Sequence, residues 1–158
     1  MAFSREYPDR PVIGVGGVII DRGRTVLIRR GTEPLRGEWS IPGGTMEIGE
    51  TLEEAVCREL REETGLEVGV LELIELFDRI YLEDGRATAS GKKKPRFHYV
   101  IADYLCELVG GEPHPGSDVT DLAFAREGDL GKFHLTEKAT SVVKKAFAMS
   151  RVRRAASP

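Results

Sequence analysis

The sequence predicts a single layered domain of the α/β or α+β class, in which helices pack on a β-sheet. The chain has 158 residues, the length of one typical domain. Roughly half of its residues are apolar or glycine, as in soluble folded proteins. Runs rich in β-branched residues are interspersed with two stretches of helical periodicity. We therefore expect one domain over residues 1–158, with flexible ends at about 1–10 and 151–158.

The amino-terminal part is expected to form a β-hairpin followed by a long loop. Residues 12–20 are apolar and β-branched, and residues 25–29 form a second such run after a turn at residues 21–24. Residues 31–44 are rich in proline and glycine and contain the only tryptophan, which indicates an ordered loop.

A helix is predicted over residues 52–64. Thr51 and Glu54 have the spacing of a capping box at the start of the helix. Gly65 follows the last helical residue, where a left-handed cap is usual. Both ends of this helix are therefore marked in the sequence.

The carboxyl-terminal half is predicted to contain a strand pair, a short strand and a second helix. The β-rich runs 70–81 and 97–108 flank a polar loop at residues 83–95 and are expected to pair. A glycine- and proline-rich loop at 110–117 precedes a short strand near 122–125. Thr136 is the expected cap of a helix that reaches about Ser150.

Composition excludes several classes of protein. The longest apolar run, residues 12–20, is far shorter than the roughly 20 residues that a membrane helix needs. The first eleven residues have no apolar core of a secretory signal, and Cys57 and Cys106 lack the spacing of a metal site. We expect a cytoplasmic protein without membrane contact. The net charge of −3 lacks the basic excess of a general nucleic-acid binder.

The acidic residues of the predicted helix form its most unusual feature. Glu59, Glu62 and Glu63 share the apolar stripe at 100° per residue, where repulsion costs a few tenths of a kcal/mol per pair. Raised pKa values, a bound cation, or ion pairs with Arg58 and Arg61 would offset this repulsion. Ligation by oxygen alone favours Mg²⁺ (or Mn²⁺) over zinc.

Residues 44–66 resemble the Nudix box, the signature of the Nudix hydrolases. Gly44 is followed after five residues by Glu50, and after seven more by the run Arg-Glu-Leu-Arg-Glu-Glu-Thr-Gly-Leu at 58–66. The resemblance implies a Nudix-type α/β/α sandwich with a mixed central β-sheet. It also implies Mg²⁺- or Mn²⁺-dependent hydrolysis of a nucleoside diphosphate linked to another moiety.

The resemblance also implies roles for individual residues. Glu59, Glu62 and Glu63 match metal-binding glutamates, and the Glu59 position serves as the base in some members. Gly44 matches a residue that contributes a backbone carbonyl, while Arg58 and Glu50 match the pair that orients the site. The family usually adds an acid from a later loop. Asp118 is our candidate for this acid, with Glu112 and Asp121 as rivals.

Substrate-binding residues are predicted from their chemistry. Arg29, Arg36 and Arg96 are candidates for binding phosphates through bidentate contacts. Phe77, Tyr81 and Phe97 are candidates for stacking a base, although strand aromatics more often belong to the core.

Segments 29–31, 36–39 and 42–44 resemble bacterial members described as ADP-ribose pyrophosphatases. A proline that marks one ADP-ribose subgroup is replaced here by Tyr81.

Three functional hypotheses follow. The leading one is hydrolysis of ADP-ribose or a nucleotide sugar, with a small-molecule nucleotide as partner. The second is removal of pyrophosphate from a (deoxy)nucleoside triphosphate, damaged ones included, or from an RNA 5′ end. The third is a non-catalytic nucleotide sensor. A homodimer remains open, because dimers are common among members of the family.

Overall fold

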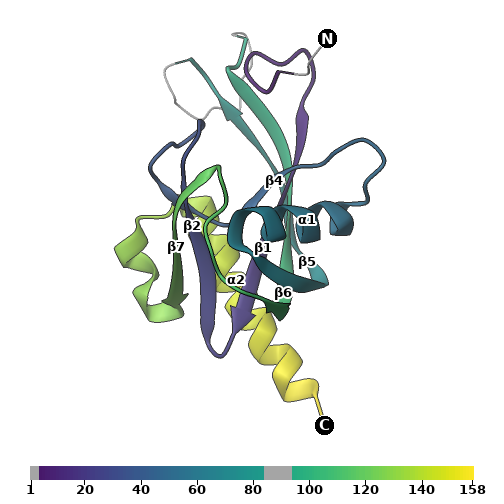
Figure 1. The fold of residues 1–158 in the computed structure, drawn as a ribbon, viewed down its shortest axis with the longest axis vertical. Coiled ribbons are helices and arrows are strands. Elements are labelled where there is room, and N and C mark those ends of the chain that lie inside the picture. The colour runs from purple at the N-terminus through teal and green to yellow at the C-terminus, as the bar shows by residue number, and fades with distance from the viewer. Residues whose placement is uncertain (1–3, 84–93) are drawn as a thin grey trace.

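The computed structural model describes residues 4–83 and 94–158 (Figure 1). Its elements, in chain order, are β1 (Val12–Asp21), β2 (Arg24–Arg30), β3 (Trp39–Ser40), β4 (Gly43–Thr45), α1 (Leu52–Thr64), β5 (Leu66–Tyr81), β6 (Phe97–Gly111), β7 (Val119–Arg126), the 3₁₀ helix η1 (Glu127–Phe133) and α2 (Glu137–Ala156). Within the described residues, no helix has the length and apolarity needed to cross a bilayer.

A mixed sheet forms the centre of the fold. Its main strand order is β3-β2-β1-β6-β5, with β4 added to β1 and β7 added to β2. Strands β1 and β6 run parallel, whereas the other pairs are antiparallel. The predicted mixed α/β sheet is therefore confirmed.

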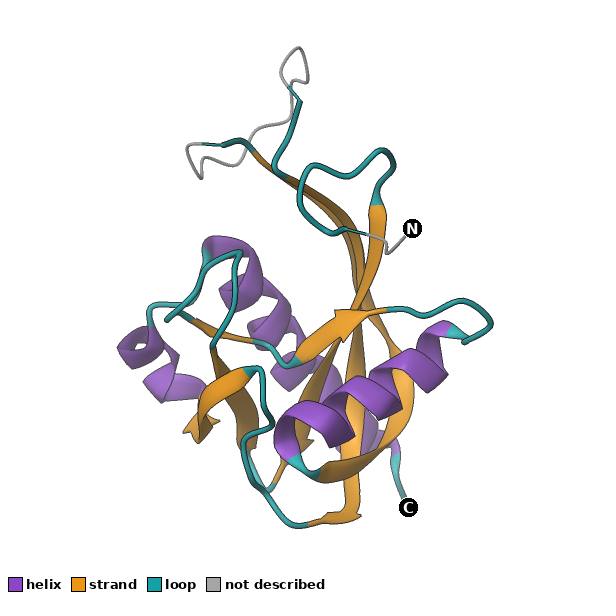
Figure 2. Cartoon of the chain, turned by 45° about the horizontal axis from the view of Figure 1, so that its top comes forward, coloured by secondary structure: helices purple, strands orange, loops and turns teal. Residues whose placement is uncertain are grey.

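Helices α1 and α2 cover opposite faces of this sheet (Figure 1), and Figure 2 shows helices on both sides of the strands. Successive side chains of each strand point to opposite faces of the sheet, so the core is divided into one part beneath each helix. On β1, Val15 and Ile19 pack with α1, while Val18 packs with α2. The pattern produces the three layers expected of an α/β/α sandwich.

The local signals in the sequence correspond to the observed helix and hairpin. The turn between β1 and β2 places Arg22 and Gly23 at positive φ. In α1, the Thr51 side chain accepts from the Glu54 backbone N–H while the Glu54 carboxylate accepts from the Thr51 N–H, and Gly65 is left-handed with φ of 73°. The predicted bounds of the helix, 52–64, are confirmed.

Other elements differ from their predicted bounds. The strand pair extends to β5 and β6, because β5 starts directly after the cap of α1. The segment 31–44, expected as a loop, also contributes β3 and β4, and η1 was not predicted. Helix α2 continues through Ala156, into the end that was expected to be flexible. Most of the predicted loop at 83–95, including Lys92 and Lys93, lies outside the described residues.

Strand β4 lies against β1 with almost no space between the two backbones. A Cβ atom on Gly43 would lie 2.0 Å from the Val15 carbonyl oxygen and 2.7 Å from the Gly16 Cα. Only glycine permits this approach. The contact holds the segment before α1 in place.

Gly43→Ala is expected to lower the free energy of unfolding by about 2 kcal/mol or more, because backbone atoms must move to admit the methyl group. Urea denaturation measures the change. Gly128→Ala is the control, since no atom lies within 4 Å of the Cβ added there. Equal stability of the two variants would contradict the close packing of β4 on β1.

Candidate active site

The glycines of β4 lie directly beneath the acidic face of α1. The Gly43 N–H donates a 3.0 Å hydrogen bond to Glu63 Oε2. A Cβ on Gly44 would lie 2.3 Å from the Glu59 carboxylate, so only glycine allows Glu59 to reach the strand backbone. Strand and helix therefore place two carboxylates beside a pair of peptide groups.

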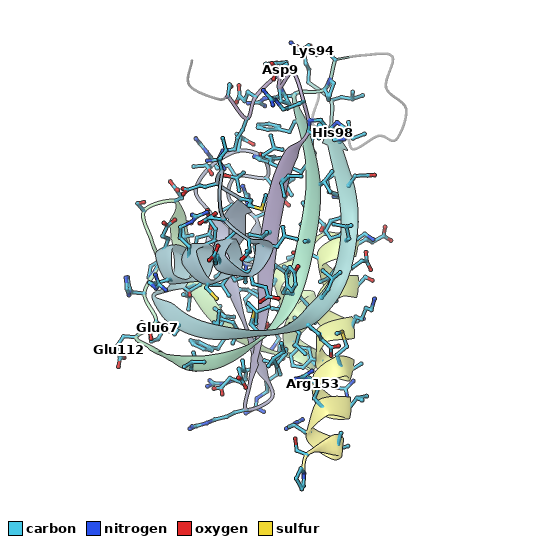
Figure 3. The ribbon with its side chains drawn as sticks, turned by 90° about the vertical axis from the view of Figure 1, so that its right-hand side faces the viewer. Asp9, Glu67, Lys94, His98, Glu112 and Arg153 are labelled. Carbon is cyan, nitrogen blue, oxygen red and sulfur yellow. The ribbon has the colours of Figure 1, made fainter. Side chains whose placement is uncertain are left out.

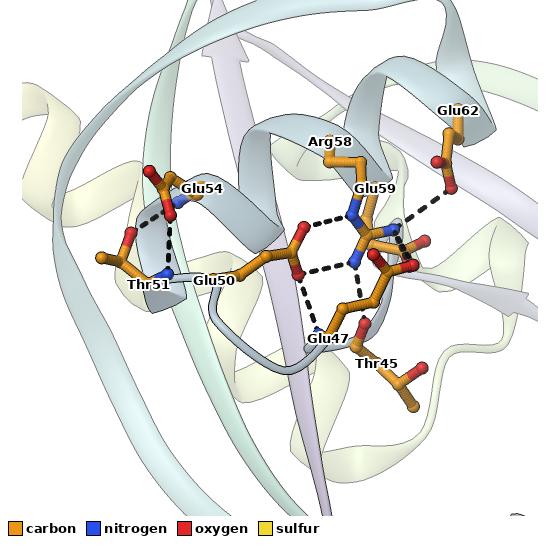
Figure 4. A network of polar contacts seen from close by, with 8 residues as sticks. All are labelled: Thr45, Glu47, Glu50, Thr51, Glu54, Arg58, Glu59 and Glu62. Atoms are coloured by element: carbon orange, nitrogen blue, oxygen red, sulfur yellow. Dashed lines mark hydrogen bonds and ion pairs between the residues drawn. The ribbon is translucent and has the colours of Figure 1, made fainter. Parts of the chain in front are cut away.

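Arg58 links the remaining acids of this region (Figure 4). Its Nη1 donates to Glu59 Oε1 at 2.8 Å and to Glu62 Oε2 at 3.3 Å. Its Nη2 donates to Glu50 Oε2 and to the Thr45 carbonyl, both at 2.9 Å, and its Nε donates to Glu50 Oε1. The bidentate contact with Glu50 fixes the guanidinium plane.

Glu50 is held in an ionised form by its partners. The contacts with Arg58, together with a hydrogen bond from the Glu47 N–H, lower the pKa of Glu50 to about 2. The two carboxylate oxygens of Glu50 both accept from the Arg58 guanidinium. An orienting role for the pair, which the resemblance implies, stays a prediction.

Burial has the opposite effect on the other two glutamates. Burial, aided by the negative charges of Glu59 and Asp118, raises the pKa of Glu63 to about 7, although the Gly43 N–H and Arg30 oppose the shift. Burial also raises the pKa of Glu59, against the lowering effect of Arg58. The site therefore holds more negative charge than its surroundings stabilise.

The donor set of the site suits a hard divalent cation. In the described residues, protein hydrogen bonds use one carboxylate oxygen each of Glu59, Glu62 and Glu63, which leaves the other oxygen of each free to bind. Among the described residues, no group of three or more His, Cys, Asp or Glu side chains is arranged as closely as the ligands of a metal ion. Arg58 contacts two of these three glutamates, Glu59 and Glu62.

One cleft of about 370 Å³ contains most of the predicted site residues, and this volume is sufficient for a nucleotide-sized ligand. It is called the glutamate cleft below. Its lining includes Gly44, Arg58, Glu59, Glu62, Glu63 and Asp118. Glu50 does not line the cleft and lies behind Arg58.

Long-range contacts bring Asp118 to the cleft. The loop before β7 packs on the end of α1, where the Gly116 N–H donates to the Glu63 carbonyl at 2.9 Å. The Gly31 N–H donates to the Asp118 carbonyl at 3.0 Å. The two rival acids lie elsewhere: Glu112 is exposed where β6 ends (Figure 3), and Asp121 bonds to the Leu122 N–H.

The three predicted phosphate-binding arginines do not line the glutamate cleft. Arg29 is exposed and donates to the Gly37 carbonyl, while Arg36 is exposed in the loop after β2. Arg96 forms an ion pair with Glu6 at 3.0 Å. Local pairing directs the Arg29 and Arg96 side chains elsewhere, so a phosphate contact by these three arginines stays a prediction without support from the cleft.

Three other arginines, Arg5, Arg30 and Arg79, line the cleft in their place. Arg30 follows Arg29 on β2, so strand alternation was the signal that two adjacent arginines cannot share one face. Among the aromatic candidates, Phe77 and Tyr81 line the cleft, whereas Phe97 is 3% exposed in the core. No local signal in the sequence identifies Arg5 or Arg79.

Comparison with known proteins agrees with this arrangement. The model of the NUDIX domain matches residues 10–145. An ADP-ribose pyrophosphatase of Methanocaldococcus jannaschii is 34% identical over 122 residues, which cover 77% of this chain and 66% of that protein. A MutT-like protein of Streptomyces ambofaciens is 42% identical over 135 residues, which cover 84% of this chain and 76% of that protein.

A solved structure has the same fold. The crystal structure of a MutT NUDIX hydrolase from Burkholderia pseudomallei has a TM-score of 0.72 and 29% identity, and the match covers 87% of this chain and 98% of that one. The chain spans less than two thirds of several curated relatives, among them 38% of a putative mutator protein MutT4 of Mycobacterium tuberculosis. Because the domain model covers most of the chain and includes the glutamates of α1, the chain belongs to the Nudix hydrolase family.

Proposed function

We propose that this chain hydrolyses the pyrophosphate bond of a nucleoside diphosphate linked to another moiety, with ADP-ribose or a nucleotide sugar as substrate. One observation carries the proposal: a single cleft brings the carboxylates of α1 and Asp118 together with Arg5, Arg30 and Arg79. Carboxylates are the ligands of divalent cations, and guanidinium groups bind phosphate oxygens. These two kinds of group are what a diphosphate site requires, which supports the proposal.

Glu59, Glu62 and Glu63, with the Gly44 carbonyl, would hold Mg²⁺ or Mn²⁺. A bound divalent cation neutralises charge on the phosphate oxygens and lowers the pKa of a coordinated water. The cleft arginines would orient the diphosphate so that water approaches in line with the bond to be broken.

The protein groups themselves would position and move the proton. Glu59 is half-buried and held through Oε1 by Arg58, which leaves Oε2 toward Gly44 and available to accept a proton from water. Asp118 is the second candidate base, on a loop tied to α1. Arg58 and Glu50 act as positioning residues, since neither presents a free acceptor to the cleft.

The named relatives favour two substrate types. The archaeal relative is named an ADP-ribose pyrophosphatase, which supports the diphosphate-linked substrate. A relative in Mycobacterium tuberculosis, 37% identical over 103 residues, is named a putative 8-oxo-dGTP diphosphatase, which supports the alternative of a nucleoside triphosphate, damaged ones included. The products separate the two: ADP-ribose yields AMP and ribose phosphate, whereas a triphosphate yields a monophosphate and pyrophosphate.

Incubation with ADP-ribose and Mg²⁺ is expected to yield AMP and ribose 5-phosphate, and Glu63→Gln is expected to reduce kcat at least about 100-fold. The introduced amide oxygen still accepts the Gly43 N–H but lacks the charge. Anion-exchange chromatography quantifies the products. Glu53→Gln, on the exposed side of α1, is the matched control and should retain activity. Undiminished turnover by the Glu63 variant would refute the assignment of this site.

Arg30→Ala is expected to raise the KM for the substrate about tenfold with a smaller change in kcat, since one charge-assisted phosphate contact is lost. Arg29→Ala, on the neighbouring residue that points away from the cleft, is the control. Steady-state kinetics of the two variants test the placement. A larger rise in KM for Arg29→Ala than for Arg30→Ala would show that Arg29, and not Arg30, contacts the phosphate.

Without metal, Glu63→Gln is expected to be more stable than the wild type above pH 7 and equal to it below pH 4.5. Burial raises the folded-state pKa of Glu63 from 4.5 to about 7, so the folded state binds more protons in this window and stability falls as pH rises through it. The difference above pH 7 is on the order of 3 kcal/mol.

Urea unfolding at pH 4.5 and pH 8 measures this difference. Millimolar Mg²⁺ should reduce it at pH 8, because the cation binds only the ionised carboxylate of the wild type. A stability difference that is independent of both pH and Mg²⁺ would argue against a buried, cation-binding Glu63.

A further inference from the structure

A second buried acid lines the glutamate cleft away from α1. Asp103 lies on β6 between Gly16 of β1 and Glu75 of β5, on the face that α2 covers. It is 4% exposed, and a Cβ on Gly16 would lie 2.2 Å from its Oδ1. The carboxyl therefore lies over the Gly16 backbone, in space that only glycine leaves open.

No described residue stabilises this carboxyl by a hydrogen bond. Burial, aided by the negative charge of Glu75, raises the pKa of Asp103 to about 7. Lys138 is the nearby cation that opposes this shift, but its Nζ binds Glu75 instead. An ionisable group buried without a donor destabilises the fold.

The packing around Asp103 gives it no structural role. Its neighbours on the same face of β6 are Ile101, partly buried, and Leu105, fully buried in the core beneath α2. An apolar residue would continue this face without the desolvation penalty. A residue that breaks the local pattern and lines a cleft indicates a contact with ligand.

The surroundings of Asp103 suit the nucleoside part of a nucleotide. Phe77 and Trp39 pack against the core cluster beneath α2 and line the cleft, as do Thr136 and Lys138 at the start of α2. The Lys138 Nζ lies 5.0 Å from the centre of the Phe77 ring. Flat apolar walls with one unpaired acceptor are the composition of a site that orients a ligand by few polar contacts.

We propose that Asp103 determines specificity by accepting two adjacent hydrogen-bond donors from the nucleoside part of the substrate. The inference rests on the proposed nucleotide chemistry of the cleft and extends it to the group that is recognised. Two parts of a nucleotide present such a donor pair: the N1–H and N2 amine of guanine, and the 2′ and 3′ hydroxyls of ribose. A carboxylate binds either pair through its two oxygens.

Isothermal titration with nucleoside monophosphates and Mg²⁺ at pH 8 tests the inference. These ligands contain no pyrophosphate bond, so binding is measured without turnover. GMP and IMP differ by the guanine amine, and AMP and 2′-deoxy-AMP differ by one hydroxyl. The wild type is expected to bind either GMP at least tenfold more tightly than IMP, or AMP at least tenfold more tightly than 2′-deoxy-AMP. The first result would identify guanine as the source of the two donors, and the second would identify ribose.

Asp103→Asn is expected to reduce that preference to less than threefold, because the amide replaces one acceptor with a donor of nearly the same shape. Its melting temperature at pH 8 should not fall, since the variant removes an uncompensated charge. Glu107→Gln, an exposed position on the same strand, is the control and should keep the preference.

Loss of the preference in Asp103→Asn supports the inference even if ADP-ribose is not hydrolysed, in which case only the proposed function fails. Three results would overturn it: no ligand preference in the wild type, a preference that survives Asp103→Asn, or absence of binding by all four ligands. A lower melting temperature with unchanged preference would identify Asp103 as a structural residue.

Discussion

The close approach between the backbone of β4 and the carboxylates of α1 is the contact on which the site depends. Gly43 and Gly44 leave no side chain between strand and helix, so Glu63 meets a peptide N–H and Glu59 reaches the Gly44 backbone. Strand β4 also packs so closely on β1 that a methyl group at Gly43 would not fit between the two backbones. Gly43 therefore serves both the packing of β4 on β1 and the geometry of the site, while Gly44 serves the site alone.

The excess of negative charge around this contact is balanced unevenly. Arg58 neutralises Glu50 and restrains Glu59 and Glu62, whereas Glu63 has one backbone donor and lies in a desolvated position. Such an arrangement is less stable than a neutral core of the same volume. The fold compensates with the apolar clusters on both faces of the sheet, and the unbalanced charge remains available to a cation.

The helix and the hairpin could be predicted because their signals are local. Thr51, Glu54 and Gly65 fix the ends of α1 through contacts within a few residues, and the glutamates follow from helical spacing. Strand alternation separates Arg29 from Arg30, but the sequence does not say which of them faces the cleft, because the pairing of β2 with β7 shifts register between them. Asp118 and Arg5 reach the cleft through contacts with distant parts of the chain. The residues next to them in the sequence give no sign of this placement.

The cleft is lined from both extremes of the chain, with Arg5 before the first strand and Lys138 in the last helix. The amino-terminal segment is held by the Tyr7 N–H, which donates to the Arg96 carbonyl at 2.8 Å. During synthesis, the carboxylates of α1 emerge from the ribosome long before Lys138 does. A nascent chain therefore exposes its acidic helix before the residues of α2 that complete the lining of the glutamate cleft have been synthesised.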